Sequence, residues 1–319
     1  MTRRILITGG AGFIGSHIAE ALAESGNHVI VFDNLSTGSR ANLPDSIKLV
    51  RGDVRCVDDL APVFTDGVDV VLHIAGQASI RLSFQDPAND LNVNTLGTIN
   101  VLQQCVQHHV PRLLFASSMT IYGHPETVPT PEDTPAVPVS NYGVTKYAAE
   151  RYVHIMSTRR DLGFDFNVTS FRMFNVYGPR QSLTNAYQGV LAFFMGNVLR
   201  GEPITIHSDG EQFRDFVYIS DVVRAWIKAI DQPATFGETI NLGTGRPTSV
   251  NQVCDAVLQA SGHARSTYPI QYGDAQPGDL RQSLADIRKA QSLLGWEPKV
   301  TFEEVIEQTF AWARDSQLF

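Results

Sequence analysis

A short apolar run followed at once by closely spaced glycines constrains the fold of this chain more than any other stretch. Residues 5–8 read Ile-Leu-Ile-Thr, residues 9–15 read Gly-Gly-Ala-Gly-Phe-Ile-Gly, and apolar residues then recur at helical spacing up to Gly26. The glycines fit either G-x-G-x-x-G or the variant G-x-x-G-x-x-G. A strand, a glycine loop and a helix in this order predict that the backbone approaches a dinucleotide pyrophosphate at the helix N-terminus. The residues expected to contact the dinucleotide are Gly9, Gly12, Phe13, Ile14 and Gly15.

The second expected strand ends in an acidic residue where a dinucleotide-binding fold needs one. Residues 28–32 form an apolar run that ends at Asp33, 18 positions after Gly15. A carboxylate at this point bonds the adenosine 2′-hydroxyl and repels a 2′-phosphate, so NAD is favoured over NADP. The alternative is that Asp33 is only a turn residue before Asn34, but the glycine loop lies at the right distance for a cofactor role.

Apolar runs and helical patterns continue to alternate along the first half of the chain. Strands are expected at residues 47–50, 68–74, 112–116 and 166–173, and helices at 57–64 and about 87–108. This alternation predicts an α/β fold, a Rossmann-type doubly wound parallel sheet covered by helices on both faces. Ligands bind beyond the carboxyl ends of such strands. That rule selects further cofactor contacts at Asn34, Ser36, Thr37, Gly38, Asp53, Val54, Ile74, Ala75, Gly76 and Met173.

Three polar residues in this half have competing interpretations. Asp53 could bond the adenine amino group and Asn92 could hold a nearby loop by its amide, but each could instead be an ordinary turn or cap residue. His73 lies in an apolar strand without a second ligand at metal spacing, so we expect a core histidine with its hydrogen bonds satisfied. No metal site is expected.

Tyr142 and Lys146 are four residues apart and stack on one face of a helix that Ser140 or Asn141 can cap. A free tyrosine ionises near pH ~10, and a neighbouring lysine and the helix N-terminus both favour the phenolate. Such a pair could therefore supply a base for an alcohol proton. Taken alone, however, it is more often a surface stacking pair. The helix is expected to continue until Gly163 offers a stop.

Together with Ser118, these motifs resemble the extended short-chain dehydrogenase/reductase family. The segments that carry the resemblance are Thr8–Gly15, Asp33, Phe115–Gly123 and the pair Tyr142-x3-Lys146. Within the family the chain resembles, over essentially its whole length, the NAD-dependent nucleotide-sugar 4-epimerases of the UDP-glucose/UDP-galactose type. The resemblance replaces the surface-pair interpretation with a catalytic one.

The resemblance implies catalytic roles for Ser118, Tyr142 and Lys146. Tyr142 would take the proton of the sugar 4-hydroxyl while hydride leaves C4 for the nicotinamide. Lys146 would hold the nicotinamide ribose and, with the cationic ring of NAD, lower the tyrosine pKa. Ser118 would bond the same sugar oxygen. The 4-keto sugar would then turn over and receive the hydride on its other face.

The residues after Ser118 separate this chain from sister enzymes that it resembles. The 4,6-dehydratases carry an Asp-Glu pair there and the 4-keto decarboxylases a Glu, whereas this chain has Met119 and Thr120. Both activities are therefore disfavoured, and Met119 is expected to be a packing residue. A UDP-glucuronate 4-epimerase or a keto-sugar reductase remains an alternative. A non-catalytic NAD-binding regulator would not need Ser118, Tyr142 and Lys146 together.

The second half of the chain supplies the expected UDP-sugar contacts, at Asn175, Arg214, Arg281 and Ser283. Arg214 resembles an arginine that clamps the substrate diphosphate, with an ion pair to Asp215 or Asp221 as the alternative. Arg281 could be a second phosphate ligand or a surface salt bridge. Ser283 aligns with a position that is Tyr in strictly glucose/galactose epimerases, and a small side chain there leaves room for an N-acetylhexosamine.

Domain limits and surroundings complete these expectations. We expect an NAD-binding domain over residues 1–178 and a smaller mixed α/β substrate-binding lobe over 179–319, some segments of which return to the first domain. The second half should contain helices at about 186–199 and 302–312, a strand at 203–206, and a turn at 208–211 before the segment 214–218.

The net charge of -8 disfavours nucleic acid and anionic membranes as main partners. The three scattered cysteines, together with an N-terminal apolar run too short for a signal peptide, favour the cytoplasm. In relatives, helices matching 92–108 and 142–160 form a homodimer interface, and we expect one here.

Overall fold

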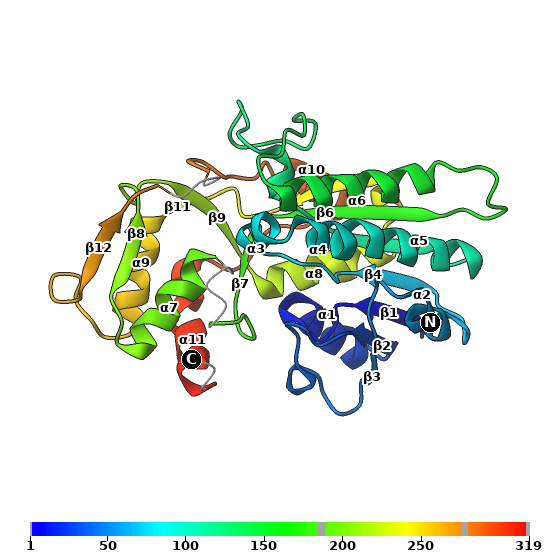
Figure 1. Ribbon diagram of the computed structural model, residues 1–319, viewed down its shortest axis with the longest axis horizontal. Coiled ribbons are helices and arrows are strands. Elements are labelled where there is room, and N and C mark those ends of the chain that lie inside the picture. Colours follow the sequence, from blue (N-terminus) through cyan, green and yellow to red (C-terminus); the bar gives the residue numbers. More distant parts are fainter. Residues whose placement is uncertain (1, 184–188, 276–279, 317–319) are drawn as a thin grey trace.

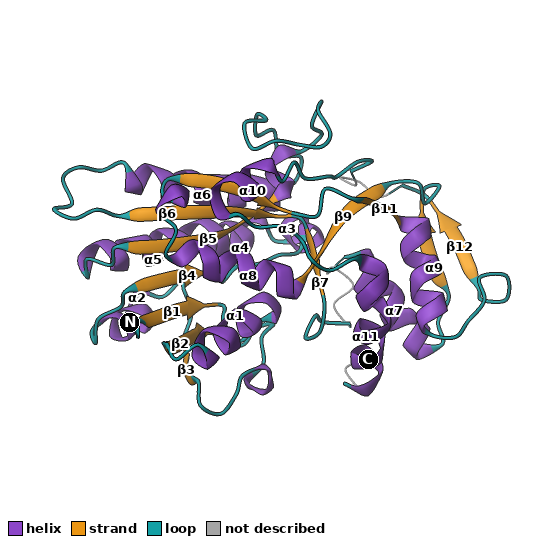
Figure 2. Cartoon of the chain, turned by 180° about the vertical axis from the view of Figure 1, so that it is seen from behind, coloured by secondary structure: helices purple, strands orange, loops and turns teal. Residues whose placement is uncertain are grey.

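The computed structural model describes residues 2–183, 189–275 and 280–316. A seven-stranded, entirely parallel sheet forms the centre of the larger of two lobes (Figures 1 and 2). Its strand order is β10-β6-β5-β4-β1-β2-β3. These strands are β1 (Arg4–Thr8), β2 (His28–Asp33), β3 (Lys48–Arg51), β4 (Val70–His73), β5 (Arg112–Ser118), β6 (Asn167–Met173) and β10 (Glu238–Leu242). The predicted doubly wound parallel sheet is confirmed.

Helices cover both faces of this sheet. On one face lie α1 (Phe13–Glu24), α8 (Ile219–Ile230) and α10 (Arg288–Leu294). On the other lie α2 (Val57–Phe64), α5 (Gly97–Gln107) and α6 (Asn141–Ser157). Successive residues of a strand point to opposite faces, so β1 sends Ile5 and Ile7 to the first layer and Leu6 to the second.

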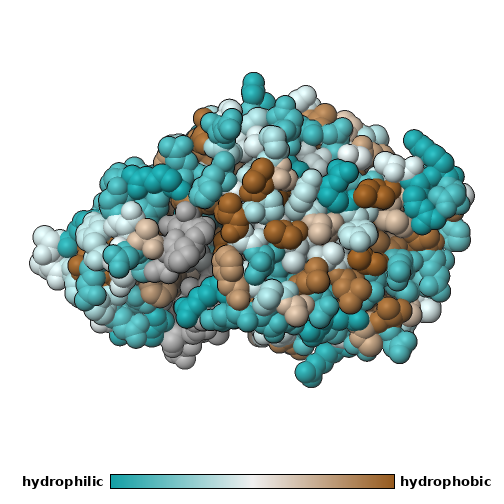
Figure 3. Space-filling model, turned by 45° about the horizontal axis from the view of Figure 1, so that its top comes forward, coloured by the Kyte–Doolittle hydropathy of each residue, from teal (hydrophilic) through white to brown (hydrophobic). Residues whose placement is uncertain are grey.

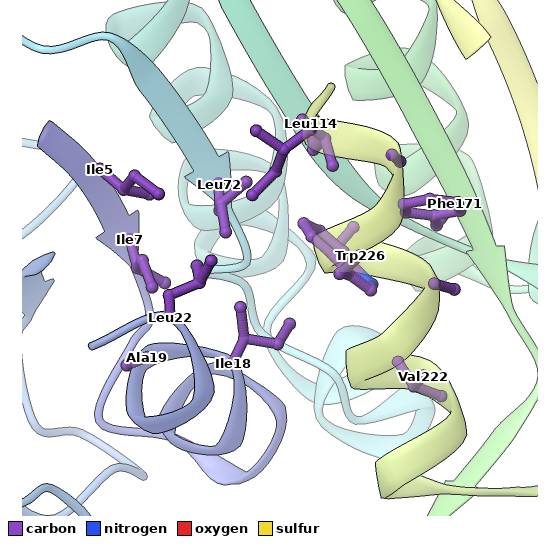
Figure 4. Close-up of a cluster of buried hydrophobic side chains, with 14 of the residues drawn as sticks. Ile5, Ile7, Ile18, Ala19, Leu22, Leu72, Leu114, Phe171, Val222 and Trp226 are labelled. Atoms are coloured by element: carbon purple, nitrogen blue, oxygen red, sulfur yellow. The ribbon is translucent and has the colours of Figure 1, made fainter. Parts of the chain in front are cut away.

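The first layer packs tightly around a tryptophan from the second half of the chain (Figure 4). Trp226 of α8 is fully buried, and its ring centroid lies 5.2 Å from that of Phe171 on β6. Ile18 and Leu22 of α1 and Leu72 of β4 belong to the same cluster. Burial of such large apolar side chains stabilises the fold by about 1.5–3 kcal/mol each, so α8 is an integral part of the larger lobe.

The expected helix over residues 87–108 is present but not uniform. It consists of α4 (Pro87–Leu91), a π-helical turn at Asn92–Leu96 and α5. A short helix that the sequence pattern did not suggest, α3 (Ile80–Gln85), precedes it and is capped by Ser79. Helix α6 ends at Ser157, earlier than the expected stop at Gly163. π-Helical turns occur frequently at functional sites, which directs attention to this region.

The smaller lobe joins two short sheets and three helices around its own core. One sheet contains β7 (Asn175–Tyr177), β9 (Phe213–Tyr218) and β11 (Pro247–Ser249), and the other pairs β8 (Ile204–His207) with β12 (Ile270–Gly273). The helices are α7 (Val190–Arg200), α9 (Val250–Ala260) and α11 (Phe302–Asp315). Of these elements, β8, α7 and α11 match the strand and the two helices expected in the second half, although residues 186–188 of the first expected helix lie outside the described part of the chain.

The two lobes are not consecutive halves of the sequence. α8, β10 and α10 all follow Gly178, yet they belong to the layers of the larger lobe. The 3₁₀ turns Arg40–Asn42, Met119–Tyr122 and Pro233–Thr235 complete the described elements. Within the described ranges, no helix has the length and apolar character needed to cross a bilayer. β6 runs directly into β7, so the carboxyl ends of the central strands face the smaller lobe (Figure 1).

Candidate active site

The glycine loop between β1 and α1 is a tightly packed backbone cradle. Gly9 has a φ of 70°, and a Cβ built on it would lie 2.5 Å from the Ala75 nitrogen. A Cβ on Gly15 would lie 2.3 Å from the Gly9 oxygen. Gly12 is the N-cap of α1 and offers no side-chain hydrogen bond, so the first-turn N–H groups at Phe13 and Ile14 lack a capping side chain. Such a helix N-terminus suits an anionic pyrophosphate.

Asp33 fixes this loop to the end of β2. Its Oδ2 accepts a hydrogen bond from the Ala11 nitrogen at 2.9 Å, and its Oδ1 accepts one from the Leu35 nitrogen at 2.8 Å. The buried carboxylate thus organises both the glycine loop and the turn that follows β2. Asp33 can therefore be both a turn residue and a cofactor ligand, because its turn contacts hold its side chain at the edge of the glycine loop.

The remaining residues of this edge surround the same loop. Asn34 donates to Asp53 Oδ2 at 2.9 Å, and a Cβ on Gly38 would approach Ala11 to 2.8 Å. Asp53 also pairs with Arg55 at 2.7 Å, and these hydrogen bonds hold the pKa of the Asp53 carboxyl well below its ordinary value. Among the other expected contacts, Ser36 and Thr37 are exposed. Val54 is buried against Gly97, and Ile74 and Ala75 adjoin Gly9. Met173 lies opposite Ser118 on the neighbouring strand.

The structure corrects the role expected of Asn92. Its side chain is exposed, whereas Asn94, two residues further along the helical stretch, is fully buried. Asn94 Oδ1 accepts from the Gln77 nitrogen at 2.9 Å, and Asn94 Nδ2 donates to the Gln77 oxygen at 3.0 Å. Asn94 therefore holds the loop after β4. Side chains two residues apart on a helix point in nearly opposite directions. The sequence pattern therefore identified the right helix but the wrong asparagine.

Ser118, Tyr142 and Lys146 come together where β5 ends and α6 begins. Ser118 is the last residue of β5, and Ser140 caps α6 by accepting from the Gly143 nitrogen at 3.1 Å. This cap places Tyr142 in the first turn of α6, with its phenol in hydrogen-bond contact with the Ser118 hydroxyl. Lys146 is 4% exposed, and its Nζ lies 4.4 Å from the centroid of the Phe115 ring. The lysine faces Gly76 at the end of β4.

Within the protein alone, burial outweighs the hydrogen bond that lowers the pKa of Tyr142. Burial raises the pKa of Tyr142 to about 12, although the Ser118 hydrogen bond lowers it and Asp90 raises it further. Burial also lowers the pKa of Lys146 to about 8, while Asp90 and Glu150 favour its charged form. The cost of burying a phenolate exceeds the benefit of its hydrogen bond to Ser118, so a lowered pKa depends on the cationic ring of NAD and stays a prediction.

On the substrate side, Asn175 begins β7, where the chain leaves the larger lobe. Its Oδ1 atom is buried and has no hydrogen-bond partner within the described part of the chain. A buried unpartnered oxygen costs about 1–3 kcal/mol, so Asn175 is suited to receive a donor from a bound molecule. Ser283 is also buried, and its hydroxyl contacts the Met119 sulfur at 3.5 Å, directly beside Ser118. Met119 itself packs with Ile121 and Tyr122, as expected.

The two arginines differ. Arg281 forms an exposed ion pair with Asp209 at 2.6 Å, so the surface salt bridge considered for it is the observed contact. Arg214 Nη1 donates to the Phe213 oxygen at 2.9 Å. Asp215 accepts from Thr244, Gly245 and Ala285, and Asp221 pairs with Arg224. Both carboxylates considered as partners of Arg214 are thus engaged by other groups.

The sequence did not reveal the roles of Asp90, Thr145 and Thr120 in the site. Asp90 is fully buried and accepts from Thr145 Oγ1 at 2.7 Å, which ties α4 to the residue before Lys146. Thr120 donates from Oγ1 to Ser118 Oγ at 3.0 Å. Polar residues on the buried side of amphipathic helices were the available signal. Among the described residues, no group of three or more His, Cys, Asp or Glu side chains is arranged to hold a metal.

Comparisons with known proteins agree with this geometry. The model of the NAD dependent epimerase/dehydratase family matches residues 5–243. A UDP-glucose 4-epimerase from Mycolicibacterium smegmatis is 34% identical over 98% of this chain and 99% of its own. The crystal structure of a Thermotoga maritima UDP-glucose 4-epimerase with UDP-glucose shares 38% identity over 98% of this chain and 99% of its own, with a TM-score of 0.91.

A Thermus thermophilus UDP-glucose 4-epimerase, solved with NAD, has the same identity and coverage of both chains, with a TM-score of 0.89. These matches extend over essentially the whole sequence, and they include the cofactor edge and the smaller lobe alike. The chain therefore belongs to the NAD dependent epimerase/dehydratase family.

Proposed function

We propose that this protein is an NAD-dependent nucleotide-sugar 4-epimerase that inverts C4 of a UDP-hexose or a UDP-N-acetylhexosamine. The observation that carries the proposal is the meeting of Ser118, Tyr142 and Lys146 at the sheet edge that also holds the glycine loop. The uncapped N-terminus of α1 and the side chain of Asp33 suit the pyrophosphate and a ribose hydroxyl of NAD. Family membership and the relatives solved with UDP-glucose or NAD support the same assignment.

When bound, NAD supplies a hydride acceptor and a positive charge beside the phenol. Tyr142 takes the proton of the C4 hydroxyl, and Ser118, in contact with the phenol, donates to the oxygen that carries the developing negative charge. Lys146 keeps a cation near the tyrosine, and its position opposite Gly76 would let it hold a ribose of NAD. The pKa of about 12 that burial gives Tyr142 means that these positive charges must do most of the work of ionising it.

The substrate contacts proposed are Asn175, Arg214 and Ser283, with Arg281 joining them only if its ion pair with Asp209 opens. Asn175 offers an unpartnered buried oxygen, and a guanidinium such as that of Arg214 suits a diphosphate. Ser283 contacts Met119, the neighbour of Ser118, and its side chain is much smaller than a tyrosine. We infer that this small side chain would admit an N-acetylated sugar alongside a plain hexose. We also propose the other cofactor contacts expected from the sequence. Asn92 is the exception, because Asn94 holds the loop instead.

A panel of substrates tests the proposal. Purified protein is incubated without added NADH with UDP-glucose, UDP-N-acetylglucosamine or UDP-glucuronate, and the products are separated chromatographically. We expect the 4-epimer of at least one of the first two, and we expect Tyr142→Phe to reduce turnover by at least about a thousandfold while NAD binding persists. Conversion of UDP-glucuronate alone would favour a glucuronate epimerase. A requirement for external reductant would favour a keto-sugar reductase, and NAD binding without conversion would favour a regulator.

We further propose that the protein works in the cytoplasm as a homodimer. Helices α4 to α6 expose several large apolar side chains, at Leu91, Leu96, Val144, Tyr152 and Ile155. Figure 3, in which this side of the molecule comes forward, shows hydrophobic side chains gathered among polar ones. A self-complementary pairing of this face in a two-fold dimer would remove that surface from water.

A further inference from the structure

Asp90 is a carboxylate enclosed by neutral donors at the end of α4. Its side chain is fully buried. Oδ1 accepts from Gln77 Nε2 at 2.7 Å and from Asn94 Nδ2 at 3.1 Å, and Oδ2 accepts from Thr145 Oγ1 at 2.7 Å. Burial raises the pKa of the Asp90 carboxyl, whereas the hydrogen bonds from Thr145 and Gln77 and the charge of Lys146 favour its ionised form. Burying a charge is costly unless the charge is paired and hydrogen-bonded. A buried charge on Asp90 therefore requires a physical explanation.

The partners of Asp90 connect the cofactor edge with the catalytic helix. Gln77 follows Gly76 in the loop after β4, and its backbone is clamped by Asn94. Thr145 immediately precedes Lys146 on α6, and its carbonyl oxygen accepts from Thr95 Oγ1 at 3.0 Å. Asp90 is thus bonded at once to the loop beside the expected nicotinamide ribose and to the helix turn that carries the lysine.

The charges around Lys146 make Asp90 distinctive. The titratable groups that face this lysine are Asp90 from α4, Tyr142 and Glu150 from α6, and His73 from β4. Glu150 is neutralised by Arg172, which lies 2.6 Å away in an almost fully buried ion pair. Burial holds the pKa of His73 at about 3, so the imidazole is neutral. Asp90 is therefore the negative charge near Lys146 that no guanidinium cancels among the described residues.

We propose that Asp90 is a positioning residue that serves as the counter-ion of Lys146 and fixes the catalytic helix against the cofactor loop. The proposal rests on the catalytic roles assigned above to Tyr142 and Lys146. It assigns to Asp90 a trade-off: the carboxylate keeps the buried lysine charged, and it opposes ionisation of the nearby phenol. In agreement, Asp90 raises the pKa of both Lys146 and Tyr142. Contact with sugar or cofactor is not part of its role.

Direct measurement of the lysine pKa tests the counter-ion role without turnover. The chain has five lysines, so protein labelled with ¹³C and ¹⁵N at lysine gives few side-chain NMR signals, and Lys146→Arg assigns the relevant one. In Asp90→Asn the pKa of Lys146 should fall by roughly one pH unit, as expected on removal of one nearby opposite charge. The asparagine keeps the shape of the aspartate, and the Thr145 hydroxyl can turn to accept its N–H. An unchanged Lys146 pKa would overturn the proposal.

The pH profile of turnover supplies the second readout. Because Asp90 raises the pKa of both Tyr142 and Lys146, Asp90→Asn should move the acid and alkaline limbs of kcat/KM together toward lower pH. A residue with only a structural role would lower the profile without moving it, and that result would contradict the proposal. Asp86→Asn is the matched control, since this exposed aspartate caps α4 and asparagine caps equally well. Its Lys146 pKa and its profile should equal those of the wild type.

Two further outcomes are informative. If Asp90→Asn does not fold, the wild-type Lys146 signal is titrated to acid pH, where a second inflection should appear as Asp90 takes up its proton. A signal that stays flat below neutral pH would reject the coupling. If the wild type converts no nucleotide sugar, the proposed function fails, whereas the lysine titration still decides whether Asp90 controls the charge of Lys146.

Discussion

Thr120 occupies both hydrogen-bond acceptor positions of the Ser118 hydroxyl. Ser118 Oγ accepts from the Thr120 nitrogen at 3.3 Å and from Thr120 Oγ1 at 3.0 Å. A hydroxyl has two acceptor positions and one proton. With both acceptor positions taken, Ser118 can only donate, and its proton is directed toward the phenol of Tyr142 or the sugar oxygen. Thr120 therefore fixes the direction of the hydrogen-bond chain that stabilises negative charge.

Thr120→Val should reveal this control. Loss of the Thr120 donor lets the Ser118 hydroxyl rotate, and a hydrogen bond to a charged group is worth about 1.5–3 kcal/mol. We expect kcat to fall about tenfold to a hundredfold with little change in KM, as measured with the preferred UDP-sugar. Thr120→Ser keeps the hydroxyl and should retain most of the activity. Equal losses in the two variants would show that packing, and not the hydroxyl, matters at this position.

The roles of individual residues could be predicted from the sequence where the local backbone geometry requires one residue type. The glycine loop and Asp33 are visible in the sequence because turn geometry and distance along the chain define them. The Tyr142–Lys146 pair follows from helical spacing. Asn94 and Asp90 were missed because their roles depend on which side of a helix is buried, and the π-helical turn at Asn92–Leu96 alters that side locally. The raised pKa of Tyr142 could not be foreseen, because it depends on three-dimensional burial.

At the scale of elements, His73 joins β4 to β1 and to α5. Thr98 Oγ1 donates to the Asn94 oxygen at 2.6 Å, so it must accept from His73 Nε2, 2.9 Å away. His73 Nδ1 then accepts from Thr8 Oγ1 at 2.6 Å. This network requires the neutral imidazole, and it confirms the expectation of a satisfied core histidine. Burial correspondingly lowers the pKa of His73 to about 3.

His73 should make the fold sensitive to acid. In the unfolded chain its pKa is near ~6.5, so between that pH and about 3 the unfolded state binds a proton that the folded state refuses. Stability is therefore lost as the pH falls through this window. From pH ~7 to ~5 the contribution is about 2 kcal/mol. Urea unfolding should show that His73→Asn reduces the pH dependence of the free energy of unfolding by this amount, and an unchanged dependence would contradict the assignment.

The order of elements in the first half was predictable because period-two and helical patterns alternate clearly there. α3 was missed, since its six residues give too short a pattern to recognise, although Ser79 caps it. The end of α6 was placed too late because Gly163 offered an obvious stop, whereas the helix already ends at Ser157. Element type thus followed from local sequence, while element limits depended on packing.

For the whole molecule, the sequence does not indicate how the second half is divided between the lobes. β10 adds the outermost strand beside β6, and α8 buries Trp226 against Phe171, although both elements follow Gly178. These are long-range contacts without a local signal. They also make the larger lobe dependent on both halves of the chain, because residues 1–178 lack strand β10 and helices α8 and α10, and residues 179–319 lack the other six strands of its sheet.

The exposed apolar face of α4 to α6 is the expected dimer interface. Tyr152 and Ile155 are exposed on α6, on the side opposite Lys146 and Glu150, which are buried. In a two-fold dimer each substitution changes the interface twice, and burial of one such side chain is worth about 1.5–3 kcal/mol. Ile155→Glu should therefore convert a dimer into a monomer in analytical ultracentrifugation at micromolar concentration.

Val137→Glu is the matched control, because Val137 is equally apolar and exposed but lies in the loop before α6. It should leave the dimer intact. A monomeric wild type, or a dimer that survives Ile155→Glu, would remove this face as the interface. A single chain supplies Ser118, Tyr142 and Lys146, so a monomeric variant should retain the catalytic arrangement. A simultaneous loss of turnover would then mean that dimer formation holds α6, and with it the start of the helix at Ser140, in the position that proton transfer needs.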